Sequence, residues 1–256
     1  MACSKRTRLI HYFSPPLAGG DGGEGVTRTP WHPHPLPCGV KSSTPQGKPS
    51  PIKGEGEHHS SGEKLKVLGL FGSPRRGGNT DLLLEETLKG AETEGAEVER
   101  IHLSDFTITP CKECHGCDQT GNCVILDDME KIYPKLIEAD IIILASPIFF
   151  YGITAWAKAL IDRSQALWAR KYLLKDPSMG KGGRKKRGFF ISVGATKGQK
   201  VFEGAILTAK YFFDALNAEY AGELVFRGVD AKGDILKQQG ALQQAFEAGR
   251  RLVRDQ

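Results

Sequence analysis

The sequence lacks an apolar run long enough to cross a membrane, which takes about 18 residues. Its longest apolar stretch, "IIILASPIFF", is interrupted by Pro147. The opening "MACSKRTRLIHYFSPP" has basic residues, but the apolar stretch of about 7–15 residues that a secretory signal needs does not follow. These absences exclude a membrane partner and predict a cytoplasmic protein.

Positive charge spread over the whole chain is also missing. The formal net charge is +5, but basic residues crowd into the segment 170–187, where Asp176 is the one acid. Nucleic-acid binding requires basic residues on several elements, so the sequence argues against a nucleic-acid partner. We expect 170–187 to be a solvated loop, suited to the phosphates of a dinucleotide, an acidic ferredoxin or a neighbouring subunit.

Residues 1–62 lack apolar periodicity, although they hold most of the fourteen prolines and seven histidines of the chain. Such a composition cannot offset the conformational entropy lost on folding, so we predict a disordered low-complexity tail over 1–62 and one domain over 63–256. The similar pieces "SPPLAGGDGGEG" and "SPIKGEGE" suggest translated repeat DNA and a natural start further downstream. The alternative is metal binding by the histidines of the tail, His32, His34, His58 and His59.

From residue 64 onward, strand-like and helix-like segments alternate. The strand-like segments are 64–72, 97–103, 140–146, 188–194 and 219–226, and the helix-like segments are 81–95, 127–139, 155–168, 201–217 and 234–253. Strict alternation predicts right-handed βαβ units and a parallel sheet covered on both faces. We therefore predict an α/β, flavodoxin-like, doubly wound five-stranded sheet of order 2-1-3-4-5. Ligands of such sheets bind beyond the carboxyl ends of the strands, at the topological switch point.

The loop "GSPRRGGNT", between the first predicted strand and helix, has neither the G-x-G-x-x-G of a dinucleotide fingerprint nor the G-K-S/T of a P-loop. It nevertheless combines glycines, hydroxyls, an amide and two arginines just before a helix N-terminus, which together favour phosphate binding. A plain turn with a helix cap is the simpler alternative. The candidate phosphate-binding residues are Ser73, Arg75, Arg76, Gly78, Asn79 and Thr80.

The loop "SPIFFYGIT", after the third predicted strand, offers aromatic side chains that can flank a flat ring and a glycine that permits close backbone approach. Its first apolar residues are equally typical of a buried strand end. An apolar slot beside a phosphate site fits FMN. The candidate ring-binding residues are Pro147, Ile148, Phe149, Phe150, Tyr151 and Gly152.

The segments "GSPRRGGNT", "DDM", "ASPIFFYGITAWAKALIDR" and "GVDAKGDI" together resemble those of the NADPH-dependent FMN reductase-like proteins, which have a flavodoxin fold. The resemblance runs over about 64–253. It implies that Ser73, Arg75, Asn79 and Thr80 hold the FMN phosphate, and that the ring lies against 147–152. It also implies a contact from the loop after the fourth strand, and a homodimer or homotetramer with its flavin near the interface. The residues of that loop are Gly194, Ala195 and Thr196, and the helix motif residues Lys158, Asp162 and Arg163 are expected to be structural or interfacial.

Four cysteines form the run C-x2-C-x2-C-x5-C between positions 111 and 123. Outside oxidising compartments, clustered cysteines indicate metal or redox chemistry rather than structural disulfides. Two CxxC steps in series can place three thiolates on one [4Fe–4S] cluster, and a fourth follows closely. The run resembles that of the iron–sulfur flavoproteins, a branch of the same family. Zinc, free thiols and a redox disulfide remain open alternatives for Cys111, Cys114, Cys117 and Cys123.

These features predict an FMN-dependent oxidoreductase, of the NAD(P)H-dependent FMN reductase-like type. It would carry electrons between NAD(P)H or ferredoxin and an acceptor, either a small molecule or a protein, through FMN and a [4Fe–4S] cluster. A cluster-free NAD(P)H-dependent reductase of flavin or quinone, and a flavodoxin-type electron carrier without enzymatic activity, are the alternatives. No side-chain acid, base or nucleophile stands out, so we assign no catalytic residue.

Overall fold

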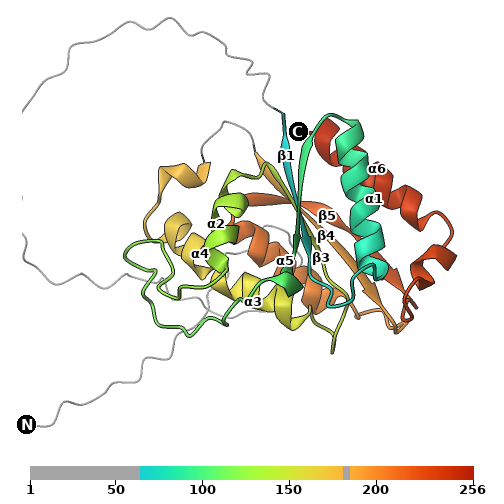
Figure 1. Ribbon diagram of the computed structural model, residues 1–256, viewed down its shortest axis with the longest axis horizontal. Helices are drawn as coiled ribbons and strands as arrows, with labels where there is room; N and C mark the ends of the chain where they lie inside the picture. Colours follow the sequence, from blue (N-terminus) through green and yellow to red (C-terminus); the bar gives the residue numbers. More distant parts are fainter. Residues whose placement is uncertain (1–63, 181–184) are drawn as a thin grey trace, which may run out of the picture. The chain divides into compact units, whose positions relative to one another are not determined.

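The computed structural model describes residues 64–180 and 185–256. Its five strands all run parallel in one sheet of order β2-β1-β3-β4-β5 (Figure 1). The predicted fold and strand order are therefore confirmed. The predictions for the tail over 1–62 lie outside the described residues. The strands are β1 (Lys66–Phe71), β2 (Glu97–His102), β3 (Ile141–Ala145), β4 (Lys186–Gly194) and β5 (Ala218–Arg227).

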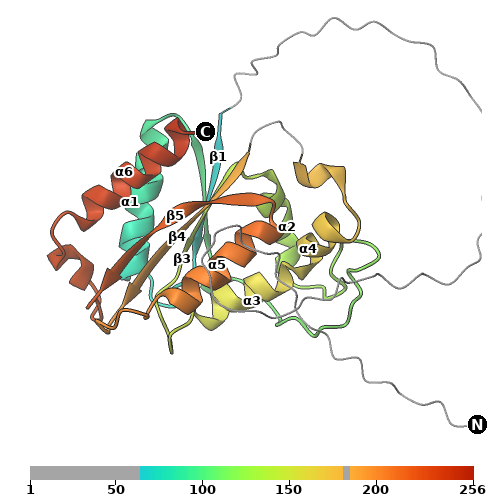
Figure 2. The ribbon, with the colours of Figure 1, turned by 180° about the vertical axis from the view of Figure 1, so that it is seen from behind.

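Helices cover both faces of the sheet, as views from opposite sides show (Figures 1 and 2). One face carries α1 (Asn79–Thr93) and α6 (Ala241–Arg254). The other face carries α2 (Met129–Glu138), α3 (Ala155–Arg163), α4 (Gln165–Tyr172) and α5 (Glu203–Ala215). None of the described helices combines the length and the apolar character that a membrane span requires.

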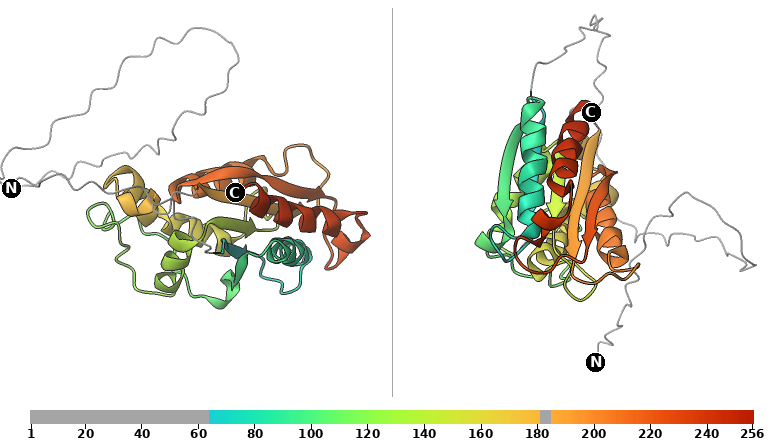
Figure 3. Two further views of the ribbon diagram at one scale, coloured as in Figure 1. Left: turned by 90° about the horizontal axis from the view of Figure 1, so that it is seen from above. Right: turned by 90° about the vertical axis from the view of Figure 1, so that its right-hand side faces the viewer.

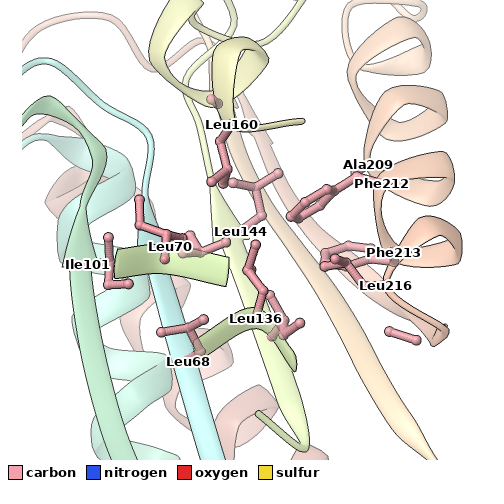
Figure 4. Packing of buried hydrophobic residues seen from close by; sticks show 14 of the residues in the cluster. Leu68, Leu70, Ile101, Leu136, Leu144, Leu160, Ala209, Phe212, Phe213 and Leu216 are labelled. Carbon is pink, nitrogen blue, oxygen red and sulfur yellow. The ribbon is translucent and has the colours of Figure 1, made fainter. Parts of the chain in front are cut away.

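Successive residues of the central strands point to opposite faces, so each strand contributes to two cores. Leu68 and Leu70 of β1 join the cluster beneath α2 to α5, whereas Val67 and Phe71 join the cluster beneath α1 and α6. Figure 4 shows the first cluster, with Leu144 of β3 among its labelled side chains. Strands buried on both faces are apolar throughout, which explains why β3 reads "IIILA" without alternation.

Two of the predicted helices are each divided in the structure. The segment 155–168 forms α3 and α4, which separate at Ser164, whose Oγ donates a hydrogen bond to Leu160 O at 3.0 Å. A serine that bonds back to the preceding turn bends a helix. The segment 234–253 forms a 3₁₀ turn (Asp234–Lys237) and then α6, with Gly240 between them at φ 74°. Glycine adopts this left-handed conformation without a steric penalty. Further 3₁₀ turns lie at Leu103–Asp105 and Pro177–Gly180.

The expectation of a solvated basic loop at 170–187 is wrong for most of the described residues. Arg170 and Lys171 belong to α4, and Lys171 Nζ pairs with Asp214 Oδ1 at 2.8 Å. Lys186 begins β4 and donates to the carbonyls of Leu136 and Ile137, each at 2.8 Å. These cations therefore stabilise the fold. Lys181 and Arg184 lie outside the described residues.

Candidate functional site

Hydrogen bonds connect the loops at the carboxyl ends of the strands, at the switch point between β1 and β3. Gly72 N donates to Ala145 O at 2.7 Å, and Thr154 Oγ1 donates to Gly72 O at 2.6 Å. Ile148 N donates to Val193 O at 2.9 Å, which joins the loop after β3 to β4. These bonds hold the loops after β1, β3 and β4 side by side.

A cleft lies where these loops meet, with a volume of about 90 Å³. Many of the predicted FMN-binding residues line it: Ser73, Arg75, Gly78, Asn79, Thr80, Pro147, Ile148, Phe149 and Ala195. Sequence analysis missed the remaining lining residues: Pro74, Val193, Val229, Asp230 and Lys232. The predicted residues that do not line it are Arg76, Phe150, Tyr151, Gly152, Gly194 and Thr196.

One end of the cleft is the N-terminus of α1, which no side chain caps. Arg75 N donates to Ser73 Oγ at 3.1 Å, and Gly78 N donates to Arg75 O at 3.0 Å, so the loop closes as a tight turn before the helix. A Cβ atom at Gly78 would lie 2.9 Å from Arg75 O, which requires glycine there. The first-turn amides of α1 therefore remain as donors for an anion.

The side chain of Asn79 joins the loop after β5 to the loop after β1. Its Nδ2 donates to Ala231 O at 2.9 Å, and its Oδ1 accepts from Gly233 N at 2.9 Å and from Ile235 N at 3.2 Å. The Asn79 amide is thus engaged by the backbone rather than directed at a ligand. This connection places Lys232 at the cleft, where its Nζ donates to Arg76 O at 2.8 Å. Lys232 belongs to the segment "GVDAKGDI", which closely follows the last predicted strand. Its place after the end of a parallel strand is the sequence feature that could have predicted Lys232 at the cleft.

The neighbouring arginines of the loop have different surroundings. Arg75 lines the cleft with an exposed side chain. Arg76 forms an ion pair with Asp105 and does not line the cleft. Of these two candidates for the phosphate, the structure therefore brings only Arg75 to the cleft.

The other end of the cleft is apolar and adjoins a tight aromatic turn. Phe149 and Gly152 exchange backbone hydrogen bonds at 2.9 and 3.0 Å. The two residues between them, Phe150 and Tyr151, have φ values of 50° and 61°, a conformation that is strained for bulky residues. Phe150 is fully exposed, and Tyr151 is also largely exposed. Pro147, Ile148 and Phe149 therefore form the wall of the cleft, and the tip of the turn extends beyond it.

The four cysteines lie on the long loop between β2 and α2. Cys111 and Cys114 are exposed, and Cys117 and Cys123 are half-buried. In the part of the chain that the structure describes, no three His, Cys, Asp or Glu side chains are grouped as metal ligands are. Burial, followed by the charge of Asp118, raises the pKa of the Cys117 thiol. The four thiols are the donor set that an iron–sulfur cluster takes, but their sulfurs do not converge in this structure.

A family model, several relatives and several solved structures match this chain. The profile of the family described as NADPH-dependent FMN reductase matches residues 65–217, more than half of the chain. The chain belongs to the NADPH-dependent FMN reductase family. The match spans all strands from β1 to β4, and it includes the cysteine loop and the cleft loops after β1, β3 and β4.

Within the NADPH-dependent FMN reductase family, similar relatives are named iron–sulfur flavoproteins. One from Methanocaldococcus jannaschii is 42% identical over 133 residues, which cover 52% of this chain and 64% of the relative. One from Methanosarcina thermophila is 36% identical over 133 residues, covering 52% and 65%. The aligned part thus spans less than two thirds of either relative. The structure of an NAD(P)H:quinone oxidoreductase from Methanothermobacter marburgensis shares the fold, with a TM-score of 0.56 and 18% identity over 74% of this chain and 100% of that one.

A buried carboxyl group lies in the first turn of α1, at one end of the cleft. Asp81, in the first turn of α1, is 3% exposed, and its Oδ2 accepts from Gly77 N at 2.9 Å. Its Oδ1 is buried without a hydrogen-bond partner among the described residues. Burial raises the pKa of Asp81 to about 6, although the hydrogen bond from Gly77 and the charge of Arg76 oppose the rise.

Replacing Asp81 with asparagine is expected to stabilise the flavin-free protein near neutral pH. A carboxyl group whose pKa rises from 3.8 to about 6 on folding binds its proton more tightly in the folded state, so its ionisation lowers stability as pH rises through that window. The helix dipole opposes this effect, so we expect about 1–2 kcal/mol at pH 7.5 and a smaller gain at pH 4.5. Thermal unfolding of both proteins at both pH values measures the difference. An equal gain at the two pH values would exclude ionisation of Asp81 as its cause.

Proposed function

We propose that the protein is an FMN-dependent oxidoreductase that takes electrons from NAD(P)H or ferredoxin and passes them to a small-molecule or protein acceptor. We further propose that Cys111, Cys114, Cys117 and Cys123 hold a [4Fe–4S] cluster as its second redox centre. The observation that carries the proposal is the cleft, with an uncapped helix N-terminus at one end and an apolar wall at the other.

The residues of the cleft fit FMN from the phosphate to the ring. The amides at the start of α1, the hydroxyls of Ser73 and Thr80, and the charges of Arg75 and Lys232 supply donors for a phosphate dianion. Ile148 and Phe149 supply an apolar surface for the ring, and the exposed turn at 150–152 is suited to cover it. Membership of the NADPH-dependent FMN reductase family supports the same cofactor.

The support for the cluster proposal is the number and type of ligands in the cysteine loop. The sulfurs themselves do not form an assembled site. Four thiols within one short loop match the ligand number and type of a cubane. Metal ligands are deprotonated and gathered as the metal binds, so convergence is expected to follow metal loading. When bound, FMN exchanges electrons in pairs with a nicotinamide and a cluster exchanges them singly, which would let the protein connect two-electron and one-electron partners.

A cluster-free NAD(P)H-dependent reductase of flavin or quinone is the second candidate. The specific observation in its favour is that the four sulfurs do not converge in the described structure. It uses the same FMN cleft, but leaves the cysteines as thiols. A homodimer or homotetramer remains a prediction for either candidate, and the exposed Phe150, Tyr151 and Trp156 beside the cleft support it.

The absorption spectrum of protein purified without oxygen separates the candidates. We expect flavin bands above a broad shoulder near ~400 nm, with about four iron and four sulfide ions per chain, as one cubane requires. Flavin bands without iron would leave the cluster-free reductase. Oxidation of NAD(P)H by the same sample tests for enzymatic activity. A protein that has FMN but oxidises neither nicotinamide would instead be an electron carrier, and a protein that binds no flavin would refute the proposal.

A further inference from the structure

A buried arginine joins the two ends of the cysteine loop. Arg163, the last residue of α3, is 1% exposed. Its Nη1 donates to Thr109 O at 2.9 Å and its Nη2 donates to Ile125 O at 3.0 Å. Thr109 precedes Cys111 and Ile125 follows Cys123, so one side chain closes the base of the whole loop.

The charge of Arg163 is balanced at the same place. Its Nη1 also donates to Asp127 Oδ2 at 2.6 Å, and Asp127 accepts from Thr109 N at 2.8 Å and from Met129 N at 3.0 Å. Burial disfavours the carboxylate, but these hydrogen bonds outweigh it, so the pKa of Asp127 lies below its ordinary value. A buried pair with several hydrogen bonds to the backbone fixes that backbone, because loss of either partner leaves a buried charge unpaired.

A second arginine holds the loop from α4, immediately before its last cysteine. Arg170 Nε donates to Gly121 O at 2.9 Å, and its Nη2 donates to Asn122 Oδ1. Gly121 has φ 70°, and a Cβ atom there would lie 2.4 Å from Arg170 Cγ. The segment that leads into Cys123 is thus in close contact with α4, in a conformation that only glycine adopts easily.

Cys123 therefore lies between two held segments, Gly121 and Asn122, which bond to α4, and Ile125, which bonds to Arg163. Tyr133 Oη donates to Arg163 O at 2.7 Å, which joins α2 to the same buried arginine. Arg163 Nε is buried without an acceptor among the described residues. Cys111 and Cys114, by contrast, are exposed.

We propose that Arg163, assisted by Arg170, is a positioning residue that holds Cys123 in place as the preformed ligand of the cluster, onto which the exposed cysteines close. This inference rests on the proposed [4Fe–4S] site. Arg163 lies at the base of the loop that carries the four cysteines, and positive charge near a cluster favours its reduced, more negative state. Arg163 is therefore also expected to raise the reduction potential of the centre. The Lys-x-x-x-Asp-Arg motif of α3 thus serves the cysteine loop rather than only a subunit interface.

The first test needs no iron. In chelator-treated full-length protein, trypsin cleaves after the exposed Lys112 at a rate set by the opening of the loop, and mass spectrometry of the products follows that site. Arg163→Lys keeps the charge but cannot make the two separate carbonyl bonds, so we expect about tenfold faster cleavage. Lys158→Met is the matched control, because it removes a cation from the same helix at an exposed pair with Asp162. It should leave cleavage unchanged.

The second test uses protein that has retained its iron. Arg163→Lys should lose iron to a chelator about tenfold faster than the parent protein, and Lys158→Met should lose it at the parent rate. Arg163→Met should shift the midpoint potential of the centre to more negative values, whereas Arg163→Lys should leave it nearly unchanged because the charge is kept. Tyr133→Phe, which removes the bond to Arg163 O, should speed iron loss to a smaller extent. A merely structural arginine would loosen the loop without the directional shift in potential.

Separate outcomes identify which idea fails. A parent protein that contains flavin but no iron after anaerobic purification would refute the cluster and, with it, the role of Arg163 as a positioning residue for it. A parent protein with iron, together with unchanged cleavage, iron loss and potential in the Arg163 variants, would refute the positioning role alone. If Arg163→Met does not fold, Arg163→Lys and Tyr133→Phe still decide through cleavage and iron loss.

Discussion

Replacing Arg75 with glutamate is expected to lower the affinity for FMN by about 100- to 1000-fold. The substitution removes a charge-assisted hydrogen bond to the phosphate, worth about 1.5–3 kcal/mol. It also places a like charge near a dianion, which adds about 1 kcal/mol or more at the dielectric of a protein surface. Arg75 is exposed, so the fold should be unaffected. Titration of flavin-free protein with FMN, followed by quenching of flavin fluorescence, measures the affinity.

The adjacent arginine is a matched control for this result. Arg76→Glu changes the net charge equally, but Arg76 pairs with Asp105 outside the cleft. Its replacement should weaken FMN binding by less than about tenfold, and that loss should shrink at high salt because it acts through long-range charge. Equal losses for the two variants would mean that Arg75 acts only through the overall field, and would place the phosphate elsewhere.

The fold could be predicted because its signals are local and repeated. The apolar run "IIILA" marks a strand buried on both faces, and the strict alternation of elements leaves few topologies other than the observed one. The position of the cleft followed from the same rule, since parallel strands gather their carboxyl ends at the switch point. For these features, chain order alone determines which loops meet.

The parts that escaped prediction depend on contacts between distant segments. Asn79 was expected to face a phosphate, but its amide bonds to the backbone near Ala231, more than 150 positions away. Lys232 reaches the cleft through that same connection. Phe150 and Tyr151 form a turn that normally takes asparagine and glycine, so their identity gives no turn signal. From the sequence, Arg163 could be assigned only to a helix motif. Its partners, the carbonyls of Thr109 and Ile125, lie on a loop whose position relative to α3 cannot be predicted from the sequence.

Replacing Gly249 with alanine is expected to destabilise the protein by about 3 kcal/mol, although the same change inside an isolated helix stabilises it by about 1 kcal/mol. Gly249 lies in α6, which runs beside α1 over one face of the sheet (Figure 3). A Cβ atom at Gly249 would lie 1.8 Å from Thr87 O and 3.0 Å from Ala91 N. Backbone atoms of a neighbouring helix cannot turn aside as a side chain can, so α6 would have to move away from α1.

Gly90 of α1 approaches α6 about as closely as Gly249 approaches α1, so it provides a second test of the same helix contact. A Cβ atom at Gly90 of α1 would lie 2.0 Å from Phe246 O of α6, so Gly90→Ala should separate the same two helices. Once they are apart, the second substitution costs little, and the double variant should be less destabilised than the two single losses added together. Thermal unfolding should show a decrease of roughly 5–10 °C for each single variant. Gln244→Ala, at an exposed position of α6, should show none; simple additivity of the two glycine variants would contradict a shared contact.

The contact between these helices also bears on the FMN site. The first turn of α1 forms the end of the cleft where we propose that the phosphate binds, and α6 packs against α1 over the same face of the sheet. A displaced α1 would misdirect its N-terminal amides, so Gly249→Ala should weaken FMN binding by about tenfold even at temperatures where the protein stays folded. Excess FMN should then recover part of the lost stability, because a ligand that binds only the folded state stabilises it by mass action. A variant that is less stable but binds FMN with full affinity would show that the phosphate site does not depend on α6.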